Sequence, residues 1–450
     1  MIPEHDRDDE TPNSTLTAER SPALRDLQAR MATLNVAEVV HELGRLGATD
    51  RAVAFRLLAK DRAVEVFEDL DPALQAELVA SLHGHAAAIF AALDPDDRAA
   101  LLDEVPAGVA RRLLAALPPD EHAATTALLG YPEDSAGRRM SPEVVAVPVG
   151  TTVGDTIAQV RAAGDDAETV YVVPVVADGR RVRGVVSLRR LVLTDPATPV
   201  DAVMSPATTV RATDDAEHAA NVVRDGGFVG VPVVDGEDRL VGVLTVDDAM
   251  RVLEAEDDED SARTGGAEPL RRPYLSVSVL GLVRSRVVWL LMLIVAASLT
   301  VGVQSYFEDE LAQVVALALF VPLLIGTGGN AGSQAATTVV RASAVGDVRT
   351  GDVARVVGRE MLTGLLLGLT LATVGVGPAM LVAGPAIGLV LALTVVAVCT
   401  LATTVGSSVP LLAKRVGIDP AIVSAPFIST FVDTTGLIVY FSIAKAVLGI

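Results

Sequence analysis

The chain has 450 residues and a net charge of −21, and 50% of its residues are apolar. Because a nucleic-acid partner requires a basic surface, this charge argues against DNA or RNA binding. The one cysteine, Cys399, excludes disulfides and cysteine-rich zinc sites. The average composition conceals an acidic N-terminal portion and an apolar C-terminal portion, which together indicate a multidomain membrane protein.

Residues 1–22 are polar and charged without an apolar core, which is typical of a disordered tail and unlike a secretory signal. Residues 23–130 are helical and repetitive. The segment Phe-Glu-Asp-Leu-Asp-Pro at 67–72 recurs as Phe-Ala-Ala-Leu-Asp-Pro at 90–95 and more loosely at 114–119, a spacing of about 23 residues. Asp and Pro are favoured where helices begin. The repeat therefore predicts a stack of short helices in an all-α superhelical domain.

Residues 131–253 carry a duplicated α/β pattern, and each copy opens with Met-Ser-Pro, at Met140 and Met204. Short β-branched runs alternate with helical stretches, which predicts paired strands covered by helices. The matching runs are 171–176 with 229–234, and 184–188 with 242–246. The duplicate resembles a tandem pair of CBS domains.

That resemblance implies a cleft between the two copies that binds adenine nucleotides such as ATP, with an acidic residue after the last strand holding the ribose. Asp248 stands at that place in the second copy, whereas Arg190 stands there in the first. Tyr171 and Phe228 could stack on a base. The alternative is a structural pair with no nucleotide.

Residues 254–280 are expected to form a connecting helix and linker. The helical stretch past Asp247 includes the acidic residues Glu254, Glu256, Asp257, Asp258, Glu259 and Asp260. A block of like charge is normally solvated. The alternative is that these carboxylates meet others across an interface and hold divalent cations, whose preferred ligands are oxygens.

Residues 281–450 contain apolar runs long enough to cross a membrane, since one span needs about 20 residues. They predict an all-α domain of five transmembrane helices, with the third and fourth divided at the turn-rich segment 376–385. The runs lie at 287–307, at 311–340, at 361–413, which holds two spans, and at 421–444.

The charges that flank the spans predict an orientation in the cell membrane, because basic residues favour the cytoplasmic side. Arg or Lys residues lie before the first span, between the second and third, and between the fourth and fifth, whereas the first connection is acidic. We therefore expect a cytoplasmic N-terminus and a C-terminus outside. Lys445 is the exception, and it lies close enough to the end of the last span to snorkel.

The second span ends in a segment rich in glycine and polar residues. The candidate pore-lining residues are Pro322, Gly326, Gly328, Gly329, Asn330, Gly332 and Gln334. So many glycines weaken a regular helix, and open backbone survives at membrane depth only against protein or a water-filled cavity. A polar, backbone-lined path is therefore expected. The alternative is close helix packing through Gly328 and Gly332, although Asn330 and Gln334 add polar groups that packing does not need.

Asp433 is a lone carboxylate almost midway through the last apolar run. A charge at the bilayer centre costs roughly 2.5–3.5 kcal/mol, so such a residue indicates function. The spans contain no Lys or Arg deep enough to form a salt bridge with it. We therefore expect a site for a cation or a proton.

Four segments together resemble the MgtE family of magnesium channels, and the order of the domains agrees with that family. They are 131–137, 245–248, 322–334 and 431–437. The resemblance implies a homodimer whose pore lies along the dimer axis, lined by the second and fifth helices, with Asp433 contributed by both chains. It also implies Mg²⁺-selective uptake, and because the sequence offers no catalytic constellation we expect no enzymatic activity.

The same resemblance implies that intracellular Mg²⁺ closes the pore by binding between the soluble domains. The matching regulatory positions are Asp94, Asp215, Glu217, Asp248, Glu256, Glu259 and Asp260. Four residues depart from the family pattern. Ser333 and Ala425 stand where Asn is common, Gly227 replaces an acidic residue, and Arg138 interrupts a usually small or apolar sequence.

Two other functions compete with a magnesium channel. A secondary transporter coupled to protons or sodium would use Asp433 as a titrating carrier, but a relay usually needs several intramembrane acids. A membrane-anchored enzyme would need a catalytic constellation. His41-Glu42 lacks a second His at the zinc-protease spacing, and the glycine-rich segment lacks the Lys-Ser/Thr of a phosphate loop.

Overall fold

The computed structural model describes residues 31, 33–58, 60–82, 86–164, 167–270, 274, 277–344, 346–416 and 425–450. The expected tail at 1–22 lies outside this range. The chain divides into two compact units, each described here by itself. The first comprises Met1–Ala255 with Arg271–Val277, and the second comprises Glu256–Leu270 with Ser278–Ile450.

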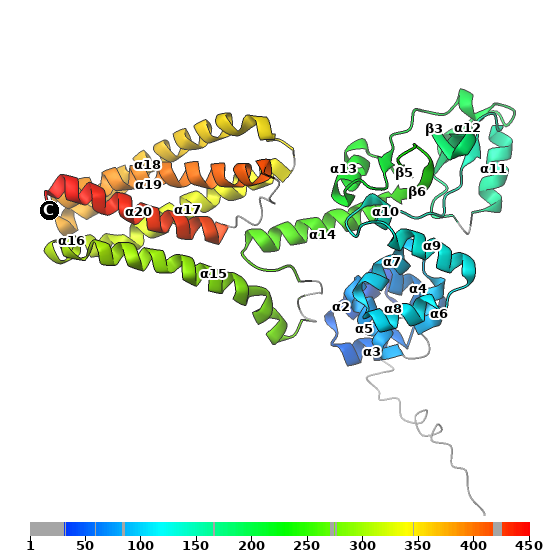
Figure 1. The fold of residues 1–450 in the computed structure, drawn as a ribbon, viewed down its shortest axis with the longest axis horizontal. Coiled ribbons are helices and arrows are strands. Elements are labelled where there is room, and N and C mark those ends of the chain that lie inside the picture. The colour runs from blue at the N-terminus through cyan, green and yellow to red at the C-terminus, as the bar shows by residue number, and fades with distance from the viewer. Residues whose placement is uncertain are drawn as a thin grey trace, which may run out of the picture. The chain divides into compact units, whose positions relative to one another are not determined.

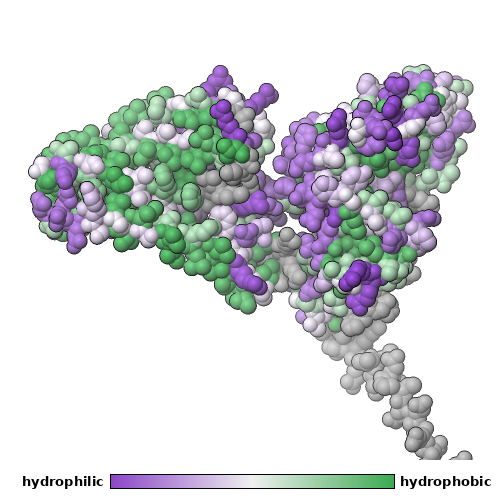
Figure 2. All heavy atoms as spheres, viewed as in Figure 1, coloured by the Kyte–Doolittle hydropathy of each residue, from purple (hydrophilic) through white to green (hydrophobic). Residues whose placement is uncertain are grey.

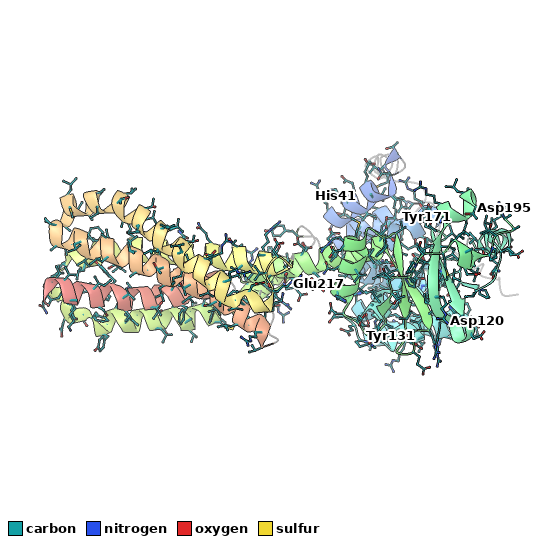
Figure 3. All side chains as sticks on the ribbon, turned by 90° about the horizontal axis from the view of Figure 1, so that it is seen from above. His41, Asp120, Tyr131, Tyr171, Asp195 and Glu217 are labelled. Atoms are coloured by element: carbon teal, nitrogen blue, oxygen red, sulfur yellow. The ribbon has the colours of Figure 1, made fainter. Side chains whose placement is uncertain are left out.

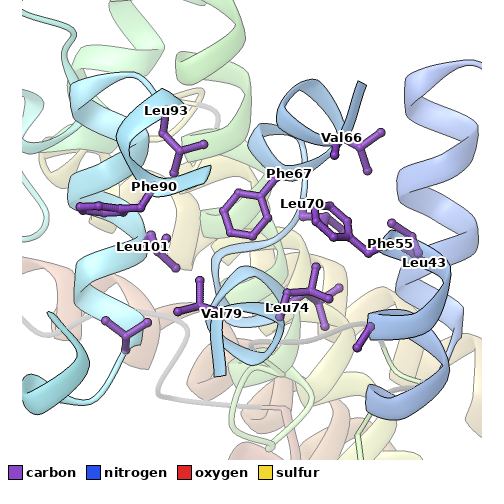
Figure 4. Packing of buried hydrophobic residues seen from close by; sticks show 14 of the residues in the cluster. Leu43, Phe55, Val66, Phe67, Leu70, Leu74, Val79, Phe90, Leu93 and Leu101 are labelled. Atoms are coloured by element: carbon purple, nitrogen blue, oxygen red, sulfur yellow. The ribbon is translucent and has the colours of Figure 1, made fainter. Parts of the chain in front are cut away.

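The first unit begins with a stack of short helices (Figure 1). They are α2 (Val36–Arg45), α3 (Ala48–Phe55), α4 (Lys60–Glu68), α5 (Pro72–Leu82), α6 (Ala86–Ala92), α7 (Pro95–Glu104), α8 (Ala107–Leu114), α9 (Pro119–Leu129) and α10 (Ala136–Arg139). Phe67 and Phe90, from two copies of the repeat, are fully buried in their shared core (Figure 4). The prolines of the three copies begin α5, α7 and α9, which confirms the predicted repeat.

A repeated hydrogen bond also joins successive helices of this stack. In each case a buried side chain near the start of a helix donates a hydrogen bond to the backbone carbonyl eight residues earlier. The pairs are Arg51 to Leu43 (2.9 Å), Gln75 to Phe67 (2.7 Å) and Arg98 to Phe90 (3.3 Å). Because the end of the preceding helix has carbonyls without helical partners, these side chains satisfy them where water is excluded.

The rest of the first unit contains two matching three-stranded sheets, ordered β1-β2-β3 and β4-β5-β6. The strands are β1 (Val147–Pro148), β2 (Val172–Ala177), β3 (Arg181–Ser187), β4 (Val210–Arg211), β5 (Gly230–Val234) and β6 (Leu240–Thr245). In each sheet the first pair is parallel and the second antiparallel. The helices between them are α11 (Val153–Ala162), α12 (Leu188–Leu193) and α13 (Ala216–Gly226). The predicted duplication is confirmed.

The two copies exchange their opening Met-Ser-Pro segments. Ser141, at the start of the first copy, forms two backbone hydrogen bonds of 2.9 Å with Val243 on β6 of the second. Ser205, at the start of the second copy, does the same with Val185 on β3 of the first, also at 2.9 Å. Each sheet is therefore completed by chain from the other copy.

The helix α14 (Val246–Thr264) begins in the first unit and ends in the second, whose remaining helices are long and apolar (Figure 2). They are α15 (Val279–Tyr306), α17 (Ala316–Ala344), α18 (Val353–Ala383), α19 (Pro385–Arg415) and α20 (Ala425–Leu448), with the short α16 (Glu308–Gln313) after the first. Within the described chain, these five long helices are suited by length and composition to cross a membrane, as the sequence predicts.

One expectation about the backbone of this unit is wrong, and another is confirmed. The helix α17 runs without a break from Ala316 to Ala344, although an irregular path was expected there. The third and fourth spans are divided within the segment 376–385, as predicted, since α18 ends at Ala383 and the chain breaks at Gly384, where φ is +87°. In a bilayer every backbone N–H and C=O must find a partner, and a continuous helix provides this internally, which outweighs the low helix propensity of glycine.

Glycines let the long helices approach closely. A Cβ on Gly328 would lie 2.6 Å from Val398 Cγ1 on α19, and one on Gly368 would lie 2.6 Å from Val396 Cα. Gly406 of α19 sits against the backbone of Gly332 on α17 in the same way. The packing role that was the alternative for Gly328 and Gly332 is therefore present in the structure.

The linker before the first long helix is attached to it. The Glu268 backbone N–H donates to the Ser285 carbonyl at 2.8 Å, and Trp289 Nε1 donates to the Glu268 carboxylate at 3.0 Å. The segment that follows α14 in the second unit is thus fixed to the first turns of α15.

Candidate cation sites

The first candidate site surrounds Asp433, one turn beyond Ser429 on α20. Gly329 of α17 faces both residues, because a Cβ placed on it would meet Ser429 Oγ and would lie 3.2 Å from Asp433 Oδ1. Asp433 Oδ1 is buried and has no hydrogen-bond partner among the described residues. A buried acceptor without a partner is rare in folded proteins and requires an explanation.

Two basic side chains of the last two spans have partners other than Asp433. Lys414 Nζ donates to the Ser343 hydroxyl at 2.9 Å, which joins α19 to the end of α17. Lys445, the exception to the charge pattern, forms a 2.7 Å ion pair with Glu310 of α16. Asp433 itself forms no ion pair within the described part of the chain.

Side-chain hydrogen bonds join α20 to its neighbours at several points along its length. Thr434, next to Asp433, shares a 2.8 Å hydrogen bond with Thr300 of α15, and the Tyr440 hydroxyl donates to the Leu317 carbonyl of α17 at 3.0 Å. Val432 and Gly436 are buried on either side. Rigid packing of the neighbours fixes the position of the Asp433 carboxylate.

The predicted pore-lining residues of α17 divide into two faces. Gly328, Gly329 and Gly332 are buried within the helical bundle, and Gly329 is the one that meets Asp433 and Ser429. The other residues are exposed and lie four residues apart, so they share one stripe of the helix. They are Pro322, Gly326, Asn330 and Gln334.

The second candidate site lies in the first unit, where α7 and the start of α14 come together. Arg251 of α14 forms ion pairs with Asp248 at 3.2 Å, Asp69 at 3.3 Å and Asp97 at 3.7 Å. We call this cluster the acidic junction. Its carboxyl-bearing members are Glu68, Asp69, Asp94, Asp96, Asp97, Glu168, Asp247 and Asp248.

Burial and mutual repulsion make the acidic junction hard to ionise. Burial, with repulsion from neighbouring carboxylates, raises the pKa of Glu68, Asp97 and Glu168 to about 7 each, although Arg251 opposes the rise at Asp97. Burial likewise raises the pKa of Asp96, to which Asp248 adds repulsion. A cation would relieve this repulsion.

Asp94 and Asp248 were predicted as site residues from the sequence, whereas Arg251 was not. The one available signal was its position three residues after Asp248, which places both on one face of a helix. Asp248 is bound on both sides, since its carboxylate also accepts a 2.5 Å hydrogen bond from Thr245. Asp94 lies at the start of α7 and contributes its charge to the cluster.

The other predicted regulatory residues lie on α13 and on α14. Asp215 caps α13 by accepting a 3.0 Å hydrogen bond from the His218 N–H, and Glu217 follows on the same helix. Glu256, Glu259 and Asp260 lie on the part of α14 that belongs to the second unit, where Glu259 pairs with Arg263. No group of three His, Cys, Asp or Glu close enough to hold a metal ion occurs in the described residues.

Comparisons with known proteins agree on one family. The model of the MgtE divalent cation transporters matches residues 321–443, that of the MgtE intracellular N domain matches 34–134, and that of CBS domains matches 136–194 and 200–255. The magnesium transporter MgtE of Thermus thermophilus is 40% identical over 429 residues, covering 93% of this chain and 95% of the relative. The chain belongs to the MgtE family.

A magnesium transporter MgtE from Enterococcus faecalis is 33% identical over 71% of this chain and 70% of its own length. A crystal structure of the cytosolic domain of the Mg²⁺ channel MgtE in complex with ATP is 38% identical, covers 51% of this chain and 94% of that chain, and superimposes with a TM-score of 0.48. As a member of the MgtE family, this chain is a membrane transporter of magnesium.

Two departures from the MgtE pattern have structural explanations. Gly227 ends α13 with φ at +61°, a left-handed conformation that strongly favours glycine over an acidic residue. Arg138 is buried, pairs with Asp103 of α7 at 2.7 Å and donates to the Leu128 carbonyl at 3.1 Å. Arg138 thus ties α10 to the helical stack.

The residues assigned to a nucleotide differ in exposure. Tyr171 is 61% exposed (Figure 3), and Phe228 is half-buried. Asp248 is only 8% exposed, and its carboxylate is held by Thr245 and Arg251. A cavity of about 520 Å³ in the first CBS copy, lined by Glu143, Gln159 and several alanines, includes none of them.

Proposed function

We propose that this chain is a Mg²⁺-selective channel for magnesium uptake. The observation that carries the proposal is the buried, unpartnered Asp433 Oδ1 beside Gly329 in a bundle of membrane-spanning helices. A carboxylate in an apolar bundle is costly, so it is retained where a cation passes.

The chemistry of the site suits magnesium. Mg²⁺ requires near-octahedral oxygen coordination and loses its water reluctantly. A carboxylate can hold a hydrated ion by accepting hydrogen bonds from the water molecules of the ion, without removing them. Such a site binds strongly enough to select the ion and weakly enough to release it.

Two surface features support a homodimer with the pore between its chains. The α15 helix buries none of its residues within one chain, and the stripe of α17 that includes Asn330 and Gln334 is exposed. A second copy would cover these surfaces in the bilayer. It would also bring a second Asp433 to the axis.

We further propose that intracellular Mg²⁺ closes the channel by binding at the acidic surfaces of the soluble region, with the N-terminus cytoplasmic and the C-terminus outside. The acidic junction supports this role because its carboxyl groups repel one another and a divalent cation would relieve that repulsion. Asp215 and Glu217, together with Glu256, Glu259 and Asp260, are the remaining proposed regulatory ligands.

The second candidate is a transporter coupled to protons or sodium. It is disfavoured because Asp433 is the one carboxylate in the apolar middle of the spans, so no chain of titratable groups leads across the bilayer.

Flux measurements on the full chain in liposomes separate the two. We expect Mg²⁺ entry that follows the Mg²⁺ gradient, is unaffected by an imposed proton or sodium gradient, and is abolished in Asp433→Ala with the dimer intact. Uptake that is driven by either gradient would establish the coupled transporter, and unchanged uptake by Asp433→Ala would exclude Asp433 from the pore.

A further inference from the structure

We propose that α15 links the end of α14 to the residue beside Asp433, through Glu268 near the start of α15 and Thr300 near its end. This inference rests on the proposed function, because it names the contacts by which ions bound to α14 would act on the pore. All of these residues belong to the second unit of the chain.

The end of α14 is joined to Glu268 by a short, hydrogen-bonded segment. Only residues 265–267 separate Thr264, the last residue of α14, from Glu268. Gly266 has φ at +69°, the left-handed conformation with which a glycine commonly ends a helix. The backbone N–H groups of this segment donate to carbonyls of α14: Gly265 to Ser261 (3.0 Å), Gly266 to Arg263 (2.9 Å) and Ala267 to Ala262 (2.9 Å). The position of Glu268 is therefore set by α14.

Glu268 contacts α15 at two points, which together we call the Glu268 clasp. Its backbone N–H donates to the Ser285 carbonyl at 2.8 Å, and its carboxylate accepts from Trp289 Nε1 at 3.0 Å. Ser285 and Trp289 are four residues apart and lie on one face of α15. Two contacts fix the orientation of the helix as well as its distance, and the bond to the carboxylate is of the stronger, charge-assisted kind.

The helix α15 is suited to carry a displacement away from the clasp. It runs without a proline from Val279 to Tyr306, so it has no built-in kink. Within one chain it buries none of its residues, and it packs mainly against α20. From Ser285 to Thr300 the helix rises about 22 Å. A shift of Glu268 would therefore move α15 as one body against α20.

The second contact lies beside Asp433. The hydroxyl oxygens of Thr300 and Thr434 are 2.8 Å apart. Because the Thr434 hydroxyl has one proton and donates it to the Thr430 carbonyl at 3.2 Å, Thr300 is the donor of the shared bond. Thr434 follows Asp433 directly in α20, so a movement of α15 is applied next to the carboxylate. Glu268 and Thr300 are thus positioning residues, which act on Asp433 through the helices that carry them.

The clasp can be tested by fluorescence, because Trp289 is the one tryptophan of the chain. In the full-length wild type, removal of Mg²⁺ should shift the emission maximum, since movement of α14 would move Glu268 relative to the indole. Glu268→Ala should abolish this shift. Ser298→Ala is the matched control on α15 and should keep it, because the Ser298 hydroxyl bonds to Val295 of the same helix. No shift in the wild type, or a full shift in Glu268→Ala, would overturn the role of the clasp.

Flux measurements in liposomes test the contact at Thr300. We expect Mg²⁺ flux in the wild type to fall as Mg²⁺ rises on the side of the soluble region. Thr300→Val keeps a similar shape and removes the hydroxyl, so the concentration for half-closure should rise about 3- to 10-fold, the effect of losing one hydrogen bond. The fluorescence shift should remain in Thr300→Val, because the clasp is intact. An unchanged half-closure concentration would exclude this contact from gating.

Combined variants show whether the two contacts act in series. Glu268→Ala should raise the half-closure concentration as Thr300→Val does, whereas Glu268→Gln should stay near the wild type, because its amide oxygen still accepts from Trp289. The double variant of Glu268→Ala and Thr300→Val should be no worse than the more affected single variant. Additive effects would show that the two contacts act separately, which contradicts a link through α15.

Failure of this inference is distinguishable from failure of the proposed function. If Mg²⁺ closes the wild type and every Glu268 and Thr300 variant closes at the same concentration, the proposed regulation stands and the link through α15 is excluded. If Mg²⁺ on the side of the soluble region does not reduce wild-type flux, the proposed regulation fails and the link fails with it. If the wild type carries no Mg²⁺ flux, the proposed channel itself is wrong.

Discussion

The site of Asp433 and the acidic junction differ in whether their carboxylates have a basic partner. In the second unit, Asp433 is the one carboxylate in the apolar middle of the spans, and its Oδ1 has no hydrogen-bond partner among the described residues. In the soluble unit, the acidic junction gathers many carboxyl groups around the built-in cation of Arg251. An acid without a counter-charge is suited to an ion that passes, whereas acids around an arginine are already partly neutralised and can respond to small changes in ion concentration.

The largest expected effect is a loss of Mg²⁺ flux that leaves the first unit of the chain unchanged. Asp433→Asn keeps the size of the side chain and removes its charge, so Mg²⁺ flux should fall about 100-fold or more. In the wild type we expect Mg²⁺ to protect residues 254–266 from proteolysis, because bound ions would hold the carboxylates of this segment. This protection should persist in Asp433→Asn. Flux into liposomes and limited proteolysis measure the two separately. A loss of Mg²⁺-dependent protection in Asp433→Asn would show that the regions are not independent.

Removing the cation of the junction should have an intermediate effect. Arg251→Ala leaves Asp69, Asp97 and Asp248 without their ion pair, and because Arg251 is partly exposed the cost should be about 1 kcal/mol. The Tm of the soluble region should fall by about 2–4 °C without Mg²⁺ and by less with saturating Mg²⁺.

Calorimetry on the full chain measures this change. Arg224→Ala is the control, because Arg224 is exposed and its ion pair within the described chain is with its exposed neighbour Asp225. A Tm that is unchanged or higher in Mg²⁺-free Arg251→Ala would contradict the view that Arg251 is the internal counter-ion.

A pH dependence should distinguish the junction further. Glu68, Asp97 and Glu168 have folded-state pKa values raised to about 7, so the folded chain holds these protons more tightly than the unfolded chain. Their contribution to stability is therefore greatest below the ordinary carboxyl pKa and is lost as the pH rises toward about 7. In Mg²⁺-free buffer the Tm of the soluble region should decline over that window, and saturating Mg²⁺ should reduce the decline. A Tm that rises with pH would contradict this assignment.

The smallest effect concerns the nucleotide. Because Thr245 and Arg251 hold the Asp248 carboxylate in the junction, and Arg190 replaces an acid in the first copy, ATP should bind more weakly than about 1 mM. Arg190→Asp should strengthen binding, as measured by isothermal titration calorimetry on the full chain. Tight binding of ATP to the wild type would show that Asp248 is not committed to the junction.

Much of this architecture could be predicted from periodicity. The repeat that ends in Asp-Pro, the duplicated strand pairs and the apolar runs are local patterns, and each corresponds to an element of the structure. Asp433 could also be recognised from the sequence, because the free-energy cost of its charge in the bilayer depends only on the apolar run that contains it.

What could not be predicted depends on neighbours from distant parts of the sequence. The close packing of α19 and α20 against the glycines of α17 is one example, because a count of glycines cannot show which helices meet them. Arg51, Arg98 and Arg138 look like surface residues until the carbonyls and carboxylates that they meet are known. The contact between Ser333 and Ala425 joins residues 92 apart in the chain.

The exchange of Met-Ser-Pro segments also constrains how the CBS pair can fold. Ser141 pairs with β6 and Ser205 with β3, so a chain severed between the copies would leave both sheets with an unpaired edge. Exposed edges are templates for aggregation. Neither copy is thus an independent folding unit, and we expect the two to unfold together. A displacement of one copy should move the other through the same backbone hydrogen bonds.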